Sequence, residues 1–210
     1  MKKIINYLTK TIKKEKALLT FITITFIIGV VFGSLFINFI SLEDKNTLTT
    51  QIVYFFNNIK KLSTDVFGLG VIIPNFLNEL FQLLIIFTLG ISMIGVIIVI
   101  LVMFFKGFTL GVTLATIILK YQLKGVLGAL LYVFPCLIIN IFIYIFISFF
   151  AVNASVKFLK ALLKKDNLNF KSFFGRYLLA FIVSIILMLL CTLIDSFLTP
   201  LLLKLFTFII

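Results

Sequence analysis

Residues 17–40 read ALLTFITITFIIGVVFGSLFINFI, an apolar run without a charged side chain. At a rise of about 1.5 Å per residue, a helix needs about 20 such residues to cross the hydrocarbon core of a bilayer. The basic tail before it, residues 1–16, makes the start of the chain look like a signal peptide. The apolar part of a cleaved signal is only about 7–15 residues long, however. We therefore expect residues 17–40 to form an uncleaved membrane anchor.

The remaining long apolar runs predict four further spans, at residues 80–105, 107–123, 125–156 and 177–203. The composition agrees, because 62% of the 210 residues are hydrophobic and only 12% are charged, against roughly 45–50% and about 25% in soluble domains. One globular core of this size could not hide such a surplus. The sequence predicts an all-α, polytopic transmembrane helix bundle in a single membrane domain, residues 1–210. Soluble enzymes, disordered proteins and disulfide scaffolds are excluded.

The uneven distribution of charge predicts the topology. The tail carries six lysines and one glutamate, and residues 157–176 carry six basic residues and one aspartate, so each has a net charge of +5, whereas loop 41–79 has −1. Short basic segments stay on the cytoplasmic side of a membrane. Five crossings then place the N-terminus inside, loop 41–79 outside, segment 157–176 inside and the C-terminus outside.

The short run 107–123 is predicted to cross the membrane, because without this crossing the basic segment 157–176 would lie on the outer side. Its uncharged part, residues 107–119, is bounded by Lys106 and Lys120, whose long side chains are expected to reach opposite membrane surfaces. In the alternative, Pro135 breaks the run 125–156 into a re-entrant element.

Loop 41–79 contains an amphipathic pattern that predicts a helix over residues 47–62. Its apolar stripe recurs at helical spacing and consists of Leu48, Ile52, Phe55, Phe56, Ile59 and Leu62. The helix either packs on its own bundle at the outer membrane surface or presents this stripe to a partner.

The basic segment 157–176 is expected to contact anionic lipid headgroups, at about 1 kcal/mol per basic residue. A nucleic-acid partner is not expected, because the basic residues are confined to short juxtamembrane stretches.

Glycines and one acidic residue stand out within the spans. Gly90 and Gly95, followed by the G-x-x-x-G pair Gly107 and Gly111, predict helices that approach one another closely. Asp195 is expected near the outer surface, as part of an ion pair or as a helix cap before Pro200. An ion relay would need further polar groups at mid-depth, and the sequence predicts few of them. Cys136 and Cys191 are predicted to be small buried apolar residues.

The sequence predicts no catalytic activity and no cofactor. It contains no histidine, so a histidine-based metal site and a Ser-His or Cys-His pair are excluded. The predicted spans contain no pair of carboxylates for acid–base chemistry.

Several short motifs along the chain carry a family resemblance. They are F-I-I-G-V-V-F-G at 26–33, L-G-I-S-M-I-G at 89–95, F-K-G-F-T-L-G at 105–111, Phe134-Pro135, F-G-R-Y at 174–177 and I-D-S-F-L-T-P at 194–200. In this order and spacing, the chain resembles the stage II sporulation protein M family over essentially its full length. The motif residues singled out are Gly90, Gly95, Lys106, Gly107, Gly111, Pro135, Arg176, Asp195 and Pro200. One departure is that the family usually carries glutamate at the position of Asp195.

The resemblance implies a role in endospore formation, in the mother-cell membrane that engulfs the forespore. Proteins similar to this one hold two peptidoglycan-degrading enzymes, stage II sporulation proteins D and P, in one complex that thins the septal wall. The expectation is a non-catalytic scaffold. The alternative is a subunit of an ion or small-molecule transporter or channel.

Overall fold

The computed structural model describes residues 10–61, 69–133, 136–164 and 170–209, and these contain helices and no strand. The long helices, in chain order, are α2 (Lys16–Phe39), α3 (Leu42–Lys61), α4 (Leu69–Ile91), α5 (Gly95–Val133), α6 (Cys136–Lys164) and α7 (Phe170–Ile209). All except α3 are long and apolar enough to cross a membrane. The predictions of an all-α bundle and of five spans are therefore confirmed.

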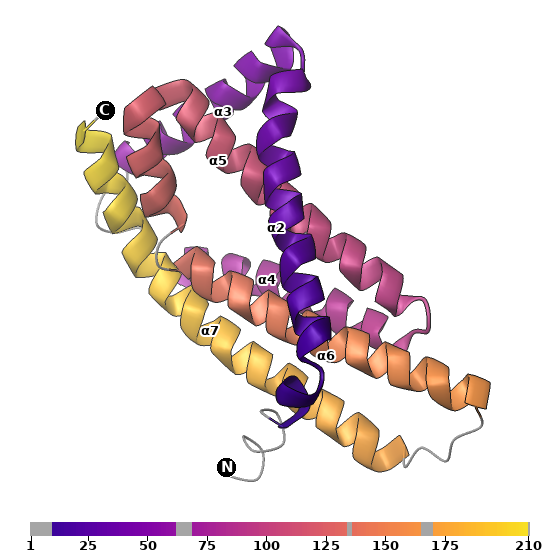
Figure 1. Cartoon of the computed structure of the whole chain (residues 1–210). Coiled ribbons are helices and arrows are strands. Elements are labelled where there is room, and N and C mark those ends of the chain that lie inside the picture. The colour runs from indigo at the N-terminus through magenta and orange to yellow at the C-terminus, as the bar shows by residue number, and fades with distance from the viewer. Residues whose placement is uncertain (1–9, 62–68, 134–135, 165–169, 210) are drawn as a thin grey trace.

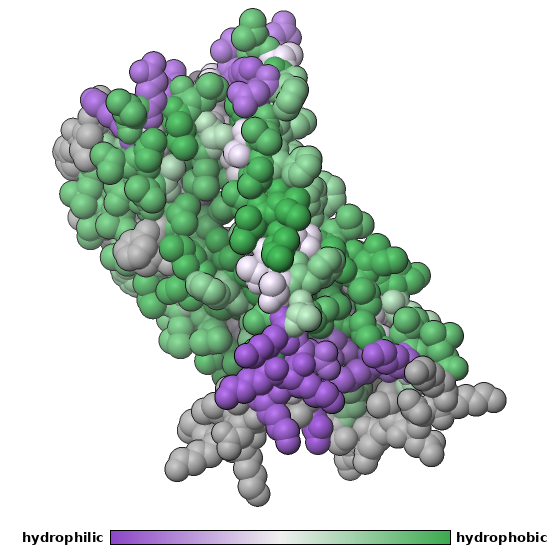
Figure 2. All heavy atoms as spheres, viewed as in Figure 1, coloured by the Kyte–Doolittle hydropathy of each residue, from purple (hydrophilic) through white to green (hydrophobic). Residues whose placement is uncertain are grey.

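The two ends of the bundle differ in what they hold. The start of α2, the end of α6 and the start of α7 lie at one end, called here the basic end, and α3 lies with the C-terminal part of α7 at the opposite end, called here the outer end (Figure 1). Between them runs a broad apolar belt, with hydrophilic residues gathered above and below it (Figure 2). The described part of the tail, residues 10–16, and the segment around Lys160 thus share an end, and their lysines predict that this end faces the cytoplasm.

Helices α2 and α5 pack closely through two glycine pairs. Gly29 and Gly33 of α2 face α5, and Gly107 and Gly111 of α5 face α2. A Cβ atom on any of the four would collide with a backbone carbonyl of the facing helix, which for Gly107 is that of Phe26. Without side chains between them, the two backbones touch and gain dispersion contacts that lipid cannot replace. The packing role predicted for Gly107 and Gly111 is confirmed, and Gly29 and Gly33 complete it.

The structure divides the second apolar run at a different place from the one predicted. Helix α4 ends at Ile91 and α5 begins at Gly95, so residues 80–105 contain a tight turn and the run 107–123 continues α5. The Ser92 amide bonds to the Leu89 carbonyl at 3.0 Å, and the Ser155 hydroxyl of α6 donates to the Ser92 carbonyl at 2.5 Å. The predicted boundary at Lys106 was wrong, because the turn contains no charge and hydropathy does not distinguish it from a helix.

The fourth span consists of two helical parts. Helix α5 reverses at Gln122, whose φ of 51° and ψ of −127° are not helical, and its last part then runs back from the outer end. A Cβ on Gly128 in this part would meet the Phe206 ring of α7. Helix α6 continues toward the basic end (Figure 1). The predicted span 125–156 therefore corresponds to the last part of α5, which ends at Val133, and to α6, which begins at Cys136, whereas Pro135 lies outside the described residues.

The predicted basic loop 157–176 consists mainly of helix ends. Helix α6 extends to Lys164 and α7 begins at Phe170, well before the predicted start of the fifth span at residue 177. Helix α7 also runs on past residue 203 to Ile209.

Candidate functional site: a polar cavity within the bundle

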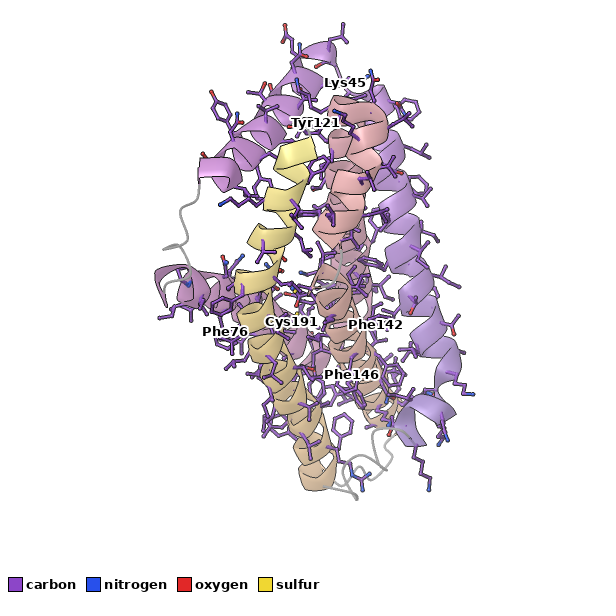
Figure 3. The ribbon with its side chains drawn as sticks, turned by 90° about the vertical axis from the view of Figure 1, so that its left-hand side faces the viewer. Lys45, Phe76, Tyr121, Phe142, Phe146 and Cys191 are labelled. Atoms are coloured by element: carbon purple, nitrogen blue, oxygen red, sulfur yellow. The ribbon has the colours of Figure 1, made fainter. Side chains whose placement is uncertain are left out.

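A cavity of about 440 Å³ lies among α4, α5, α6 and α7, with one wall residue from α2. Cys191 lies about midway along α7 (Figure 3), and Asp195, one turn farther, is on the cavity wall. The polar residues of the wall are Glu79, Gln82, Lys106, Thr109, Thr113, Tyr132, Asn140, Tyr144, Asp195 and Thr199. Polar groups inside a membrane bundle are costly to bury, and they are usually paired or functional.

Four of these residues form one network that joins α4, α5 and α6. The Tyr144 hydroxyl hydrogen-bonds to Glu79 Oε2, and Gln82 Oε1 is 3.2 Å from the same hydroxyl. The Lys106 ammonium donates to Gln82 Oε1, and its Nζ lies 3.4 Å from the centre of the Tyr144 ring. The face of an aromatic ring attracts a cation, most strongly where water is excluded. The network thus holds the lysine and the glutamate close to each other inside the bundle.

The C-terminal part of the wall comes from α6 and α7. Asp195 accepts a hydrogen bond from Thr199 Oγ1, one turn along α7. Asn140 Oδ1 on α6 is buried and has no hydrogen-bond partner among the described residues. Helix α7 continues through Pro200, and because proline has no N–H, the helical bond to the Ser196 carbonyl cannot form. On this part of the wall, a carboxylate and an amide oxygen thus lie on neighbouring helices.

The predicted positions of three residues were wrong. Lys106 and Asp195 were expected at opposite membrane surfaces, and the structure brings both to the same cavity. Glu79 was assigned to the outer loop, yet it lies within α4 and shares this cavity with Asp195. The spans therefore do contain two carboxylates. Helix α7 also continues past Pro200, so Asp195 does not cap a helix end there.

The sequence analysis assigned none of four wall residues to a site, namely Glu79, Gln82, Asn140 and Tyr144. Glu79 and Gln82 are three positions apart and therefore share a face of α4. This spacing indicates a polar face on the second span only if the helix begins as early as Leu69. No local pattern marks Asn140 or Tyr144, which lie on the cavity wall through the packing of α6.

Two of the family motifs, at residues 89–95 and 174–177, contact each other in the structure. Tyr177 of F-G-R-Y donates from its hydroxyl to the Phe87 carbonyl at 2.9 Å, and a Cβ on Gly90 would collide with that hydroxyl. A Cβ on Gly95 would collide with the Leu89 carbonyl in the tight turn. Arg176, next to Tyr177, is exposed. These motifs thus pack α4, α6 and α7 together near the basic end.

The two cysteines are free and buried, as predicted. The Cys191 thiol lies 3.5 Å from the Cys136 carbonyl at the start of α6.

The apolar stripe of the predicted outer helix faces the bundle. Phe56 and Ile59 are buried against Ile117, Ala129, Leu203 and Phe206, and Ile52 packs on the same cluster. Leu48 is half-buried and Phe55 is exposed, whereas Leu62 lies outside the described residues. Of the two interpretations of this stripe, packing on the chain's own bundle is the one that the structure shows. The opposite, polar face of α3 is the exposed one.

The N-terminus of α3 is capped by its own sequence. The Ser41 hydroxyl accepts a hydrogen bond from the Asp44 amide at 3.1 Å and donates to the Asp44 carboxylate at 2.7 Å. As the N-cap residue, Ser41 thus satisfies one backbone donor that the helix leaves unpaired. The cap and the buried stripe together hold α3 in a defined orientation.

The comparisons with known proteins identify the family. The family model described as Stage II sporulation protein M matches residues 22–200, which is most of the chain. The chain belongs to the stage II sporulation protein M family. Searches of curated proteins and of solved structures gave no match. Family membership and the five apolar helices make this a sporulation-related, multi-pass membrane protein.

Proposed function

We propose that the chain is a non-catalytic scaffold that assembles and localises peptidoglycan hydrolases for septal wall thinning and engulfment. The observation that carries the proposal is α3, which is packed on the bundle by its apolar stripe and exposes a polar face at the outer end. A surface held in one orientation loses little entropy when a partner binds. By the family resemblance, the partners are stage II sporulation proteins D and P, in the engulfing mother-cell membrane.

The exposed face of α3 offers side chains suited to protein contacts. Tyr54 has 66% of its surface exposed, and Gln51, Asn57 and Asn58 beside it are also exposed. Tyrosine is enriched at protein interfaces because it combines a large apolar ring with a hydrogen-bonding tip. At the other end, the lysines of the tail and of segment 157–176 are expected to contact anionic lipids and so to fix the orientation of the scaffold.

The decisive experiment is co-purification of the two hydrolases from sporulating cells. Tyr54→Glu combined with Asn58→Glu should sharply reduce recovery of both enzymes while membrane insertion stays normal. Lys160→Glu, an exposed substitution at the basic end, is the matched control and should leave recovery unchanged. Equal recovery with the α3 variant and the wild type would overturn docking on α3.

The scaffold also requires α3 to lie outside the cytoplasm. In intact cells, Lys45→Cys should react with a membrane-impermeant maleimide, and Lys160→Cys should react only after lysis. The native cysteines are buried and should contribute little background. Labelling of both positions in intact cells would contradict the orientation.

The polar cavity favours a second candidate, a transporter or channel subunit. Its charged and amide side chains supply mid-depth polar groups of the kind found along ion and substrate paths. A flux assay in proteoliposomes separates the two candidates. Loss of flux in Asp195→Asn with normal assembly supports transport, and absence of flux in the wild type supports the scaffold alone.

A further inference from the structure

We propose that the cavity binds a small monovalent cation, held by the carboxylate of Asp195 and the amide oxygen of Asn140. This inference goes beyond the scaffold function and does not depend on it. It equally does not require that the cation cross the membrane. It rests on the charge balance of the cavity wall, the excess of hydrogen-bond acceptors there, and the size of the space.

The charge balance favours a cation over an anion. Among the described residues of the wall, the acids are Glu79 and Asp195 and the base is Lys106. Glu79 and Lys106 belong to one network through Tyr144 and Gln82, so their charges offset each other. The groups that hydrogen-bond to Asp195 are the Thr199 hydroxyl and the Cys136 thiol, which solvate a carboxylate but do not neutralise it. Asp195 is half-buried, and a carboxylate partly withdrawn from water is unfavourable unless a positive charge or a proton joins it.

The hydrogen-bonding groups of the wall point to the same ligand class. Asn140 Oδ1 is a buried acceptor without a partner among the described residues. The hydroxyls of Thr109 and Thr113 donate to carbonyls of their own helix, those of Lys106 at 3.0 Å and Thr109 at 2.9 Å. Their oxygen lone pairs therefore remain as acceptors on the wall. Lys106, the strongest donor, is already engaged by Gln82 and the Tyr144 ring. Carboxylate, amide and hydroxyl oxygens together are the ligands of hard cations and of ammonium groups.

The charge and volume of the site favour a small cation that carries a single positive charge. One unbalanced carboxylate matches one positive charge, whereas a divalent ion would leave an excess charge in a medium of low dielectric constant. The volume of about 440 Å³ falls within the range of small-molecule sites, about 300–1,000 Å³. A space of this size accommodates a partly hydrated alkali cation or a small primary ammonium ion. Both carry one positive charge and both bind to oxygen atoms of the kind found on the wall.

The test uses the full-length protein in nanodiscs of zwitterionic lipid, so that lipid headgroups do not compete for cations. Its Tm is followed while sodium, potassium or methylammonium chloride replaces N-methylglucamine chloride at constant ionic strength. Binding to the folded state alone raises Tm in a saturable manner. We expect such a rise with one of the three cations, and whether that cation is an alkali ion or methylammonium identifies the source.

Variants then assign the site. Asp195→Asn should weaken the apparent affinity at least about tenfold, because a charged ligand is replaced by a neutral one, and Asn140→Leu should weaken it less. Lys106→Gln should strengthen cation binding by removing a positive charge from the wall. Glu43→Gln is the control for Asp195→Asn, because it also removes one negative charge but at an exposed position of α3. It should leave the apparent affinity for the cation unchanged.

Three outcomes would overturn the proposal. They are a wild-type Tm that responds to none of the cations, an Asp195→Asn variant that responds like the wild type, and a Lys106→Gln variant that loses binding. If Asp195→Asn does not fold, equilibrium binding of radioactive sodium and labelled methylammonium to the wild type and to Asp195→Glu replaces it. Binding of neither cation to the wild type then contradicts the proposal equally.

Discussion

Lys106 and Gly107 are neighbours in the sequence, yet they belong to two regions built on opposite principles. Gly107 lies in the interface of α2 and α5, where absent side chains bring two backbones into contact. Lys106 lies on the wall of the polar cavity, where side chains from α4, α5, α6 and α7 converge. The first region is made by two helices and depends on shape, whereas the second is made by four helices and depends on charge and hydrogen bonding. We therefore expect the glycine interface to be most sensitive to added volume, and the polar cavity to be most sensitive to changes of charge and hydrogen bonding.

The largest effect is expected at the glycine interface. In Gly107→Leu, the added side chain meets the Phe26 carbonyl, and a backbone group on a helix cannot move aside unless α2 separates from α5. We expect a loss of more than about 4 kcal/mol, so that little folded protein is recovered. Size-exclusion chromatography and unfolding in mixed micelles measure it.

Gly175 offers the matched control for that substitution. A Cβ there has no atom within 4 Å among the described residues, so Gly175→Ala should be neutral or stabilising by up to about 1 kcal/mol. A folded Gly107→Leu protein of normal stability would show that the interface is not held by close backbone contact.

The next largest effect is expected at Lys106. Lys106→Met leaves the carboxylate of Glu79 without its nearby cation and should lower the free energy of unfolding by about 3 kcal/mol. Adding Glu79→Gln removes that charge while keeping an acceptor for the Tyr144 hydroxyl, so the double variant should recover much of the loss. A double-mutant cycle in mixed micelles measures the coupling. Strictly additive effects would mean that the two charges do not interact.

A smaller effect is expected when one hydrogen bond of the network is removed. Tyr144→Phe keeps the ring under Lys106 but deletes the hydroxyl that bonds to Glu79. The unpaired acceptor should reduce stability by about 1–3 kcal/mol. Tyr54→Phe, the same change at an exposed position of α3, should alter stability by less than about 0.5 kcal/mol. Equal effects of the two changes would contradict a buried hydrogen bond at Tyr144.

The smallest effect is expected at Gln122, where α5 turns back from the outer end. Its φ of 51° is unfavourable for a residue with a Cβ. Gln122→Gly should therefore raise the thermal unfolding temperature, by an amount that corresponds to about 1 kcal/mol. Lys120→Gly, two residues earlier in the helix, should instead lower stability by about 1 kcal/mol. Destabilisation by both glycines would show that Gln122 is not strained.

Much of the glycine region could be predicted from the sequence, and little of the cavity could. A G-x-x-x-G pair is a local pattern that retains its meaning on any helix, and Gly107 and Gly111 were assigned correctly without the partner helix. The cavity depends on which faces of four helices meet. Placing Lys106 at the membrane surface was reasonable for a single charge between two apolar runs, but it also misplaced the turn, which lies at residues 92–94.

The sequence by itself determined that this protein is a membrane bundle of five spans, with an amphipathic helix between the first two spans and with buried thiols. Each of these properties depends on residues that are close together in the sequence. The length of the apolar runs, the distribution of charge and the helical spacing of apolar residues therefore predict them. Tertiary structure alone decided that Glu79, Lys106 and Asp195 meet in one cavity and that α3 turns its apolar stripe inward. Contacts between distant segments depend on turns and crossings in uncharged backbone, which leave no mark on hydropathy.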